Sequence, residues 1–220
     1  IELDARALPR STSRMKRALL TVVFVGTMGL GCGGSQAPTS GSSQTPQSMT
    51  STPPAPMLAT PYTAEQIRCS SEQGKRLDYW IDAPGKLREM RTIDFIAVDA
   101  QGADLEHNTL DVTGHLAEKA ERKHATWSEL RDHAAFPQGS TKVREEETTV
   151  PVGTFPCIVY EVQGPDGSVS TFWFAKTMPG PPVRMQTKRA GVMAEERQLA
   201  RLIRGSSGGA PAGCPSTKAP

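Results

Sequence analysis

The stretch 155-FPCIVYEVQGPDGSVSTFWFAK-176 contains the clearest folding signal of the 220-residue chain. Two runs rich in aromatic and β-branched residues, 155–163 and 168–176, flank the turn Pro165-Asp166-Gly167. Aspartate and glycine accept the positive φ angles that tight hairpin turns require. The stretch therefore predicts an antiparallel β-hairpin.

Shorter stretches on both sides of the hairpin alternate between apolar and polar side chains, which is the pattern of a half-buried strand. The strands expected from this pattern are residues 77–81, 90–98, 105–112 and 181–188. In the second of them, Ile93, Phe95 and Ala97 fall on one face. Residues 193–204 fit either a closing strand or a helix.

The sequence around Thr126 marks the start of a helix. Thr126 and Glu129 have the spacing of a capping box, and Pro137 lies beyond the expected end, so we expect a helix over 126–136. Its apolar face would consist of Trp127, Leu130 and Ala134. A second, shorter helix is expected at 64–68. Strands in series with one or two helices predict an α+β fold, in which an antiparallel sheet packs one main helix on one side.

The N-terminal part of the chain carries an export signal. Met15-Lys16-Arg17 precedes the 13 uncharged residues 18–30. A basic start followed by an apolar run of about 7–15 residues is typical of a secretory signal peptide, whereas a membrane-spanning helix needs about 20 residues. We therefore interpret 15–31 as a signal peptide and 1–14 as a mis-assigned start, with a long basic leader as the alternative.

Cys32 directly follows this signal. The run Gly29-Leu30-Gly31-Cys32 resembles a bacterial lipobox, with Gly29 where most lipoboxes carry leucine. The resemblance implies cleavage before Cys32 and lipidation of its thiol with acyl chains such as palmitate; an unmodified exported cysteine is the alternative. Each buried CH₂ contributes about 0.8 kcal/mol, so two or three chains would anchor the protein to a membrane. Gly33, where an aspartate commonly retains lipoproteins at the inner membrane, favours the outer membrane by analogy.

Composition divides the chain into unlike segments. Of the 29 residues 33–61, 17 are Ser, Thr or Pro and none is charged, which predicts a disordered tether. Residues 62–204 contain 11 of the 12 aromatic residues and are expected to form the globular domain. The expected organisation is 1–14 upstream residues, 15–31 signal peptide, 32–61 lipidated cysteine and tether, 62–204 α+β domain, and 205–220 disordered tail.

The charge balance excludes some classes of partner. A net charge of +2 does not suit a strongly basic nucleic-acid binder, so no nucleic-acid partner is expected. Within 62–204 there are 19 basic and 21 acidic residues, so the expected domain is slightly acidic. The basic excess lies in the export signal and the residues before it.

The order of motifs in the C-terminal half resembles two groups of envelope proteins. The motifs are Pro151-Val152-Gly153-Thr154-Phe155-Pro156-Cys157, Tyr160, Phe172-Trp173-Phe174-Ala175 and the run 179–184. They resemble uncharacterised lipoproteins of myxobacteria and, more distantly, the half-barrels of the lipoprotein-carrier (Lol-type) superfamily. The latter resemblance implies a curved antiparallel sheet that wraps a helix and can hold an acyl chain. Neither group supplies a catalytic residue.

One apolar set gives a candidate ligand face. The side chains that could line the concave side of a curved sheet are Phe95, Tyr160, Phe172, Phe174, Met185 and Met193. If the helix at 126–136 leaves this hollow open, the set could bind a hydrophobic ligand. The alternative is that these residues form the ordinary core, with Trp127 and Leu130 filling it.

The cysteines predict at most one intrachain disulfide. With Cys32 lipidated, Cys69, Cys157 and Cys214 remain, and an exported protein is in a compartment where disulfides persist. We favour Cys69–Cys157, because both lie within the expected domain and Cys214 lies in the tail. The alternatives are the other two pairings or no intrachain bond.

No motif for catalysis or metal binding is visible. The sequence lacks a Gly-x-Ser-x-Gly elbow, a phosphate-binding loop, a His-Glu-x-x-His run and paired zinc-spaced cysteines. Glu129 and His133 could meet on the expected helix, but a surface pair is the simpler interpretation. The acidic run 145–147 predicts an edge or solvated strand, and the cluster Lys119, Arg122, Lys123 and His124 predicts a solvated loop. We expect no metal, and no cofactor other than the covalent lipid on Cys32.

These patterns predict a non-enzymatic lipoprotein of the cell envelope. The domain would be held to the outer membrane through Cys32 and would serve as a structural or binding module for an envelope protein or a lipid. The alternative is a carrier of lipid or another hydrophobic ligand on the concave face of the sheet. An unrecognised hydrolase is the third hypothesis.

Overall fold

The computed structural model describes residues 55–205 and 213–214. Five predictions concern residues outside this range: the upstream residues 1–14, the signal peptide 15–31, the lipidation of Cys32, the tether up to residue 54, and the tail at 206–212 and 215–220. They stay predictions.

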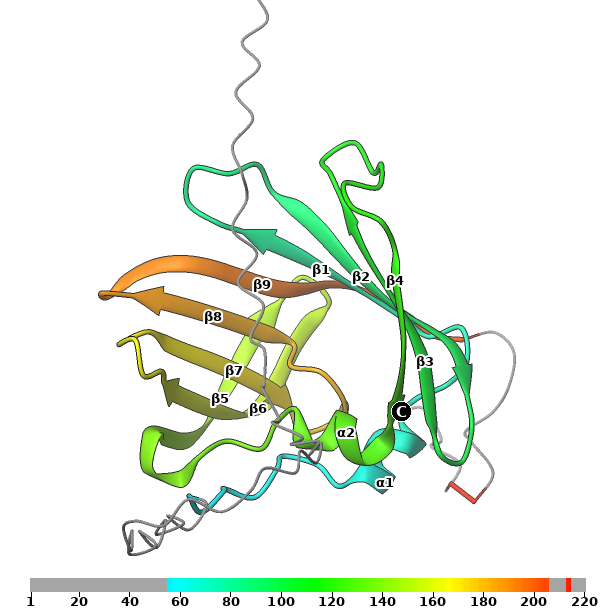
Figure 1. Cartoon of the computed structure of the whole chain (residues 1–220), viewed down its shortest axis with the longest axis horizontal. Helices are drawn as coiled ribbons and strands as arrows, with labels where there is room; N and C mark the ends of the chain where they lie inside the picture. The colour runs from blue at the N-terminus through cyan, green and yellow to red at the C-terminus, as the bar shows by residue number, and fades with distance from the viewer. Residues whose placement is uncertain (1–54, 206–212, 215–220) are drawn as a thin grey trace, which may run out of the picture. The chain divides into compact units, whose positions relative to one another are not determined.

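The described residues form one open sheet of nine antiparallel strands, in the spatial order β4-β3-β2-β1-β9-β8-β7-β6-β5. The strands are β1 (Arg76–Asp82), β2 (Glu89–Val98), β3 (Gly102–Leu110), β4 (Glu121–Thr126), β5 (Thr141–Val150), β6 (Gly153–Gln163), β7 (Val169–Ala175), β8 (Arg184–Arg189) and β9 (Val192–Ile203). The sheet is strongly curved, so that β1–β4 and β7–β9 enclose a concave side (Figure 1). The predicted α+β fold with a curved antiparallel sheet is confirmed.

The predicted hairpin is formed by β6 and β7. Their register pairs Tyr160 with Phe172, so these two aromatic side chains share a face of the sheet. At the turn, Gly167 has a φ of 75°. Asp166 Oδ1 accepts hydrogen bonds from the backbone N–H and the hydroxyl of Ser168, at 3.1 and 2.6 Å. The turn residues therefore act as the sequence predicts.

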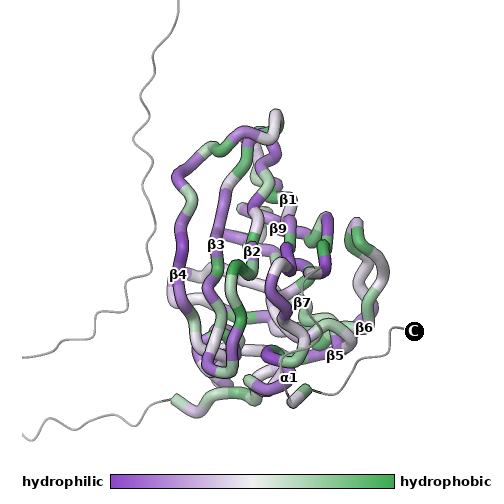
Figure 2. Tube along the Cα trace, turned by 90° about the vertical axis from the view of Figure 1, so that its right-hand side faces the viewer, coloured by the Kyte–Doolittle hydropathy of each residue, from purple (hydrophilic) through white to green (hydrophobic). Residues whose placement is uncertain are grey.

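The predicted solvated loop around Lys119, Arg122, Lys123 and His124 is wrong for residues 121–124. They belong to β4, which pairs with β3 and forms one edge of the sheet. The strand is hydrophilic along most of its length (Figure 2), so no alternation of apolar residues marks it in the sequence. Pairing with β3, and not side-chain burial, makes it a strand.

The segment 193–204, which fits a strand or a helix by sequence, is mostly strand. β9 lies inside the sheet and pairs with β1 on one side and β8 on the other. Both neighbours present ladder groups that need partners, which favours the extended conformation. The pairing of β9 with β1 also joins the two ends of the domain.

Two short helices lie beside each other at one end of the concave side (Figure 1). α1 (Ala64–Cys69) begins with a capping box formed by Thr63 and Gln66, and α2 (Trp127–Asp132) begins with one formed by Thr126 and Glu129. The predicted helix start at Thr126 is confirmed, although α2 ends earlier than the expected 126–136. In the described part of the chain, no helix has the length and apolarity needed to cross a membrane.

The connection between β4 and β5 closes part of the concave side. These strands are the two edges of the sheet, and the connection contains α2 and the 3₁₀ helix η1 (Gln138–Ser140). The chain before α1 runs beside it: the N–H of Leu58 donates to the Phe136 carbonyl and the Tyr160 hydroxyl donates to the Ala59 carbonyl, both at 2.9 Å. The domain therefore begins before residue 62, and the last residues assigned to the tether belong to it.

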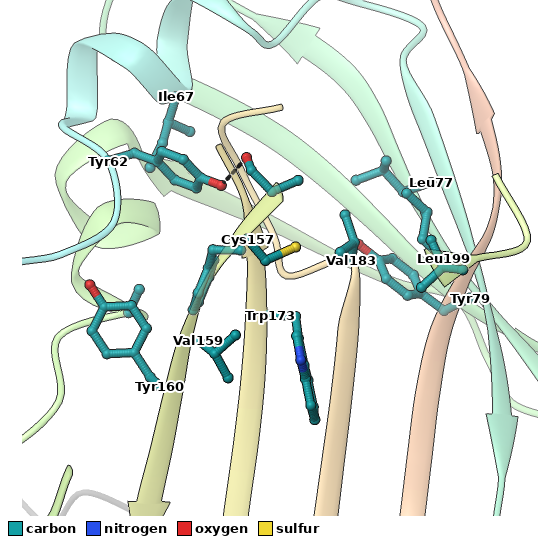
Figure 3. Close-up of a cluster of buried hydrophobic side chains, with 14 of the residues drawn as sticks. Tyr62, Ile67, Leu77, Tyr79, Cys157, Val159, Tyr160, Trp173, Val183 and Leu199 are labelled. Atoms are coloured by element: carbon teal, nitrogen blue, oxygen red, sulfur yellow. Dashed lines mark hydrogen bonds between the residues drawn. The ribbon is translucent and has the colours of Figure 1, made fainter. Parts of the chain in front are cut away.

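The core is a cluster of buried apolar side chains. Its members include Tyr62, Ile67, Leu77, Tyr79, Cys157, Val159, Tyr160, Trp173, Val183 and Leu199 (Figure 3). The buried Tyr62 hydroxyl donates to the Ala175 carbonyl at 2.6 Å (Figure 3). Burial raises the pKa of Tyr62 above its ordinary value, so the phenol stays neutral and acts as a donor.

The disulfide joins Cys69 to Cys214, with 5.3 Å between their Cα atoms. The predicted pair Cys69–Cys157 is wrong, because Cys157 lies on β6 with no exposed surface and its thiol donates to the Phe155 carbonyl at 3.4 Å. The predicted loose tail is also tied at residue 205, where the Gly205 N–H donates to Glu72 Oε1 at 3.0 Å.

Candidate functional site

A cavity of about 340 Å³ lies between the concave face of the sheet and the helices. Its wall combines residues of β1–β4 and β7–β9 with residues of α1 and α2. The principal apolar side chains are Tyr79, Ile93, Phe95, Leu105, Phe172 and Phe174 from the strands, and Ile67, Leu130 and Ala134 from the helical side. The concave side is therefore only partly filled by the helices.

The position of α2 decides how much of the hollow is filled. Its capping box begins the helix at Trp127, and the indole N–H of Trp127 donates to the Asp99 carbonyl at 3.1 Å. Trp127 is buried beside the β2–β3 turn and does not line the cavity. Leu130, Arg131 and Ala134 line the cavity instead. Of the two side chains that the ordinary-core alternative uses to fill the hollow, Leu130 therefore faces the cavity and Trp127 does not.

Of the six residues predicted as a ligand face, four line the cavity: Phe95, Phe172, Phe174 and Met185. Tyr160 packs against Phe136, with 5.2 Å between ring centroids, and its hydroxyl is bonded to Ala59. Met193 lies beside the β8–β9 turn and does not line the cavity either. The structure thus brings most of the predicted face together around an open space.

Six basic residues also line the cavity: Arg91, His107, Lys123, Arg131, His133 and Arg197. The sequence analysis did not select these residues as a group. A signal was present for Arg91, because Arg91, Ile93 and Phe95 alternate along one face of β2. No comparable signal links Arg91 to Arg197, which lies on β9 more than 100 residues later.

Burial alters the titration of two of these groups. Desolvation, reinforced by the nearby charge of Arg197, lowers the pKa of Arg91 from its ordinary value, although neighbouring carboxylates oppose this. Desolvation likewise lowers the pKa of His107, so its ring is more readily neutral than that of an exposed histidine. Of these two groups, Arg91 therefore keeps a positive charge partly away from water, whereas His107 more readily loses its charge.

The other sequence candidates do not converge on a site. Glu129 Oε2 accepts from the Thr126 backbone N–H at 2.8 Å, which commits this carboxylate to the helix cap. The hydrogen bonds from Thr126, helped by the nearby charge of Lys123, lower the pKa of Glu129. His133 lines the cavity without a hydrogen bond to that carboxylate among the described contacts. In the acidic run, Glu145 forms an ion pair with Lys176 at 2.5 Å, and β5 is an edge strand as predicted.

The opposite face of the sheet carries charges of a different kind. Asp78 on β1 has only 1% of its side chain exposed, and its carboxylate accepts from Arg76 Nε at 2.7 Å and Arg201 Nε at 2.6 Å. Nearby, Glu196 Oε1 lies 2.7 Å from Arg184 Nη2. These carboxylates alternate with residues of the cavity face along β1 and β9, and each of them has a cationic partner.

Comparison with known proteins gives only distant similarity. No protein-family model and no curated protein matches the chain. Among solved structures, the chain is similar to MucB in the Pseudomonas aeruginosa MucA/MucB complex, with a TM-score of 0.44 and 17% identity over 70% of this chain and 56% of that one.

Two further structures of MucB are similar to the same degree. MucB by itself gives a TM-score of 0.45 and 14% identity, covering 70% of this chain and 58% of that one. MucB in complex with MucA(peri) gives 0.45 and 16%, covering 71% and 62%. The chain thus spans less than two thirds of these structures. Similarity at this level carries no conclusion about what the chain binds.

Proposed function

We propose that this protein is a non-catalytic binding module of the cell envelope that takes a hydrophobic ligand into the cavity behind α1 and α2. The observation that carries the proposal is the open cavity of about 340 Å³ walled by Phe95, Phe172, Phe174 and other apolar side chains. The carrier function, second in the sequence analysis, is therefore the one that the geometry supports best.

The size and the lining of the cavity support a ligand site more than a packing defect. Protein interiors are close-packed and contain few voids larger than a water molecule. Small-molecule sites are concave, largely apolar spaces of roughly 300–1,000 Å³ with a few polar groups. A cavity of about 340 Å³ falls at the lower end of that range and has the expected mixture of lining residues.

The envelope setting rests on other observations. The run 15–31 has the form of a signal peptide, and Cys32 follows a lipobox-like sequence. The Cys69–Cys214 disulfide supports export, because such bonds persist in oxidising compartments. We propose that Cys32 is lipidated and that it holds the protein at the outer membrane. Intact-mass measurement on membrane extracts tests this anchor, and a mature chain without an acyl mass would contradict it.

Ligand binding is tested with the full chain and N-phenyl-1-naphthylamine, a neutral apolar probe that fluoresces in dry sites. We expect fluorescence enhancement with the unmodified chain and its loss in Ala134→Phe, which places a ring in the cavity. Ser128→Phe is the matched control, because Ser128 is exposed on α2, the helix that precedes Ala134 in the chain. Urea unfolding verifies that each variant is folded, and Leu130→Trp provides a second cavity-filling variant.

Native mass spectrometry of the gently extracted full chain complements the probe. A co-purifying lipid that disappears in Ala134→Phe but not in Ser128→Phe supports the proposal. Equal probe binding by all folded variants contradicts it, as does an unmodified chain that neither binds the probe nor carries a ligand.

A further inference from the structure

Two arginines of the cavity lie on either side of β1. Arg91 on β2 is opposite Tyr79, and Arg197 on β9 is opposite Ile81. Since Tyr79 and Ile81 are two residues apart on one strand, they and the two arginines share the concave face. The proximity of the arginines is reflected in the pKa of Arg91, which desolvation and then the charge of Arg197 lower.

The positive charge of the cavity is only partly balanced. In the part of the chain that the structure describes, no aspartate or glutamate lines the cavity. Arg197 Nε lies 2.6 Å from Glu195, and Arg131 Nη2 lies 2.7 Å from Asp132. Arg91 is in none of the ion pairs of the described residues, although Glu195, Glu118 and Glu89 offset part of its desolvation. A half-buried guanidinium without a direct carboxylate partner is a favourable place for an anion.

Aromatic side chains lie near the two arginines both along the strands and across the sheet. On β2, Arg91, Ile93 and Phe95 follow one another on the cavity face. At about 3.3 Å per residue, the Cα atoms of Arg91 and Phe95 are roughly 13 Å apart. Phe172 and Phe174 on β7 continue the aromatic surface across the cavity. The aromatic rings therefore lie on two sides of the arginine pair: Phe95 lies farther along β2 from Arg91, and Phe172 lies across the sheet from Arg197, with Met185 of β8 between them.

We infer that the ligand is a single-chain amphiphile with an anionic head group, of which a fatty-acid carboxylate is the simplest, with its head between Arg91 and Arg197 and its chain against Phe95, Phe172 and Phe174. This inference rests on the proposed function and names the class of ligand. A volume of about 340 Å³, at the lower end of the range for small-molecule sites, suits one chain and not several.

The chemistry of the guanidinium group explains the choice of head. Arginine donates parallel N–H···O bonds to a carboxylate or phosphate, which a neutral hydroxyl cannot match. An ammonium head would add a further cation to a cavity already lined by Arg91, Lys123, Arg131 and Arg197. An anion, in contrast, compensates charge that the folded protein already holds away from water.

The test compares two ligands that differ only in the head group. Dodecanoate and dodecan-1-ol compete for N-phenyl-1-naphthylamine on the full chain, and acetate serves as a head without a chain. We expect dodecanoate to bind at least about tenfold more tightly than dodecan-1-ol, as hydrogen bonds to charged groups allow. The preference should fall about tenfold in Arg91→Gln and in Arg197→Gln. Arg189→Gln is the control, because this arginine is exposed beside the β8–β9 turn.

The outcomes separate this inference from the proposed function. If dodecanoate and dodecan-1-ol displace the probe equally well, the inference of an anionic head group is contradicted, while the proposed hydrophobic site stands. Failure of both ligands and of the probe contradicts the proposed function itself. Displacement of the probe by acetate contradicts the assignment of an amphiphilic ligand, since it shows that a head group without a chain is bound. An unchanged preference in both folded arginine variants overturns the assignment of the head to Arg91 and Arg197.

Discussion

The two faces of the curved sheet use charge in opposite ways. On the outer face, Asp78 is almost fully buried and receives two arginines, and Glu196 receives Arg184. On the concave face, Arg91 has no direct carboxylate partner among the described residues and shares its surroundings with aromatic rings. Paired charges on the outer face therefore contribute to the fold, whereas Arg91 on the concave face is left without a direct carboxylate partner among the described residues, as the proposed anionic ligand requires.

A buried charged group that keeps its ion-pair partners costs the folded protein little free energy. Removing one member of the group leaves the remaining charges buried without a partner. Replacing a half-buried cation that has no direct partner should instead keep or raise the free energy of unfolding, because a neutral side chain removes the cost of desolvating the charge. Substitutions on the two faces should therefore change the free energy of unfolding in opposite directions.

The largest change in the free energy of unfolding is expected from loss of the disulfide. This bond joins Cys69, at the end of α1, to Cys214, and α1 covers part of the concave face. Cys214→Ser removes a bond between residues 145 apart in sequence, and loss of such a cross-link costs about 2–4 kcal/mol. Urea unfolding measures this change. Probe binding should weaken as well, because α1 contributes Ile67 to the cavity. Unaltered stability in the variant would show that the cover does not depend on the tail.

Asp78→Ala should give the next largest effect. The substitution leaves Arg76 and Arg201 without their shared carboxylate, and we expect the free energy of unfolding to fall by about 2–3 kcal/mol. Asp82→Ala is the matched control, because the Asp82–Arg88 pair is exposed and such pairs contribute about 0.2–1 kcal/mol. Similar losses from both variants would contradict the distinction between buried and exposed pairs.

Lys75 provides a buried cation for comparison with Asp78. Burial lowers the pKa of Lys75 to about 8, and its Nζ donates only to the Ser70 carbonyl among the described hydrogen bonds, at 2.8 Å. Between pH 8 and about 10.5 the unfolded chain binds the proton more tightly than the folded one, so unfolding free energy rises with pH. Relative to Lys75→Met, the unmodified chain should gain on the order of 1–2 kcal/mol across this window. If the unfolding free energies of the two proteins change with pH in parallel, the lowered pKa of Lys75 is contradicted.

The smallest effect should have the opposite sign. Arg91→Gln removes a half-buried cation near Arg197, and we expect the free energy of unfolding to stay constant or rise by about 0.5 kcal/mol. Binding of dodecanoate should weaken in the same variant. A loss of stability as large as that of Asp78→Ala would mean that Arg91 supports the fold, and the contrast between the faces would fail.

Much of the fold could be predicted from local patterns. The hairpin of β6 and β7 and the capping box at Thr126 depend on residues only a few positions apart, and both are as expected. β4 was missed because its side chains carry no apolar alternation and its pairing with β3 makes the strand. The expected Cys69–Cys157 bond failed because Cys157 is enclosed in a strand, a property of packing that cysteine counting does not contain.

The candidate site also contains residues that the sequence predicts and residues that it does not. Phe95, Phe172, Phe174 and Met185 were predicted because a curved sheet places alternating apolar residues on one face. Tyr160 and Met193 share that pattern but lie outside the cavity, since the helices and the segment around Ala59 decide where the space remains open. The six basic residues were not predicted as a group, because they come from β2, β3, β4, β9 and the region of α2.

Local sequence thus sets the strand pattern, the turns, the helix starts and the α+β class, because each depends on neighbours along the chain. It also carries the predicted export signal and the proposed lipidation of Cys32, both of which rest on residues adjacent in the chain. The tertiary structure decides which charges gain partners, which cysteine meets Cys69, and that an open cavity remains behind the helices. These features depend on strands that are far apart in sequence: Arg91 and Arg197 come to one face only because β2 and β9 pair with opposite sides of β1.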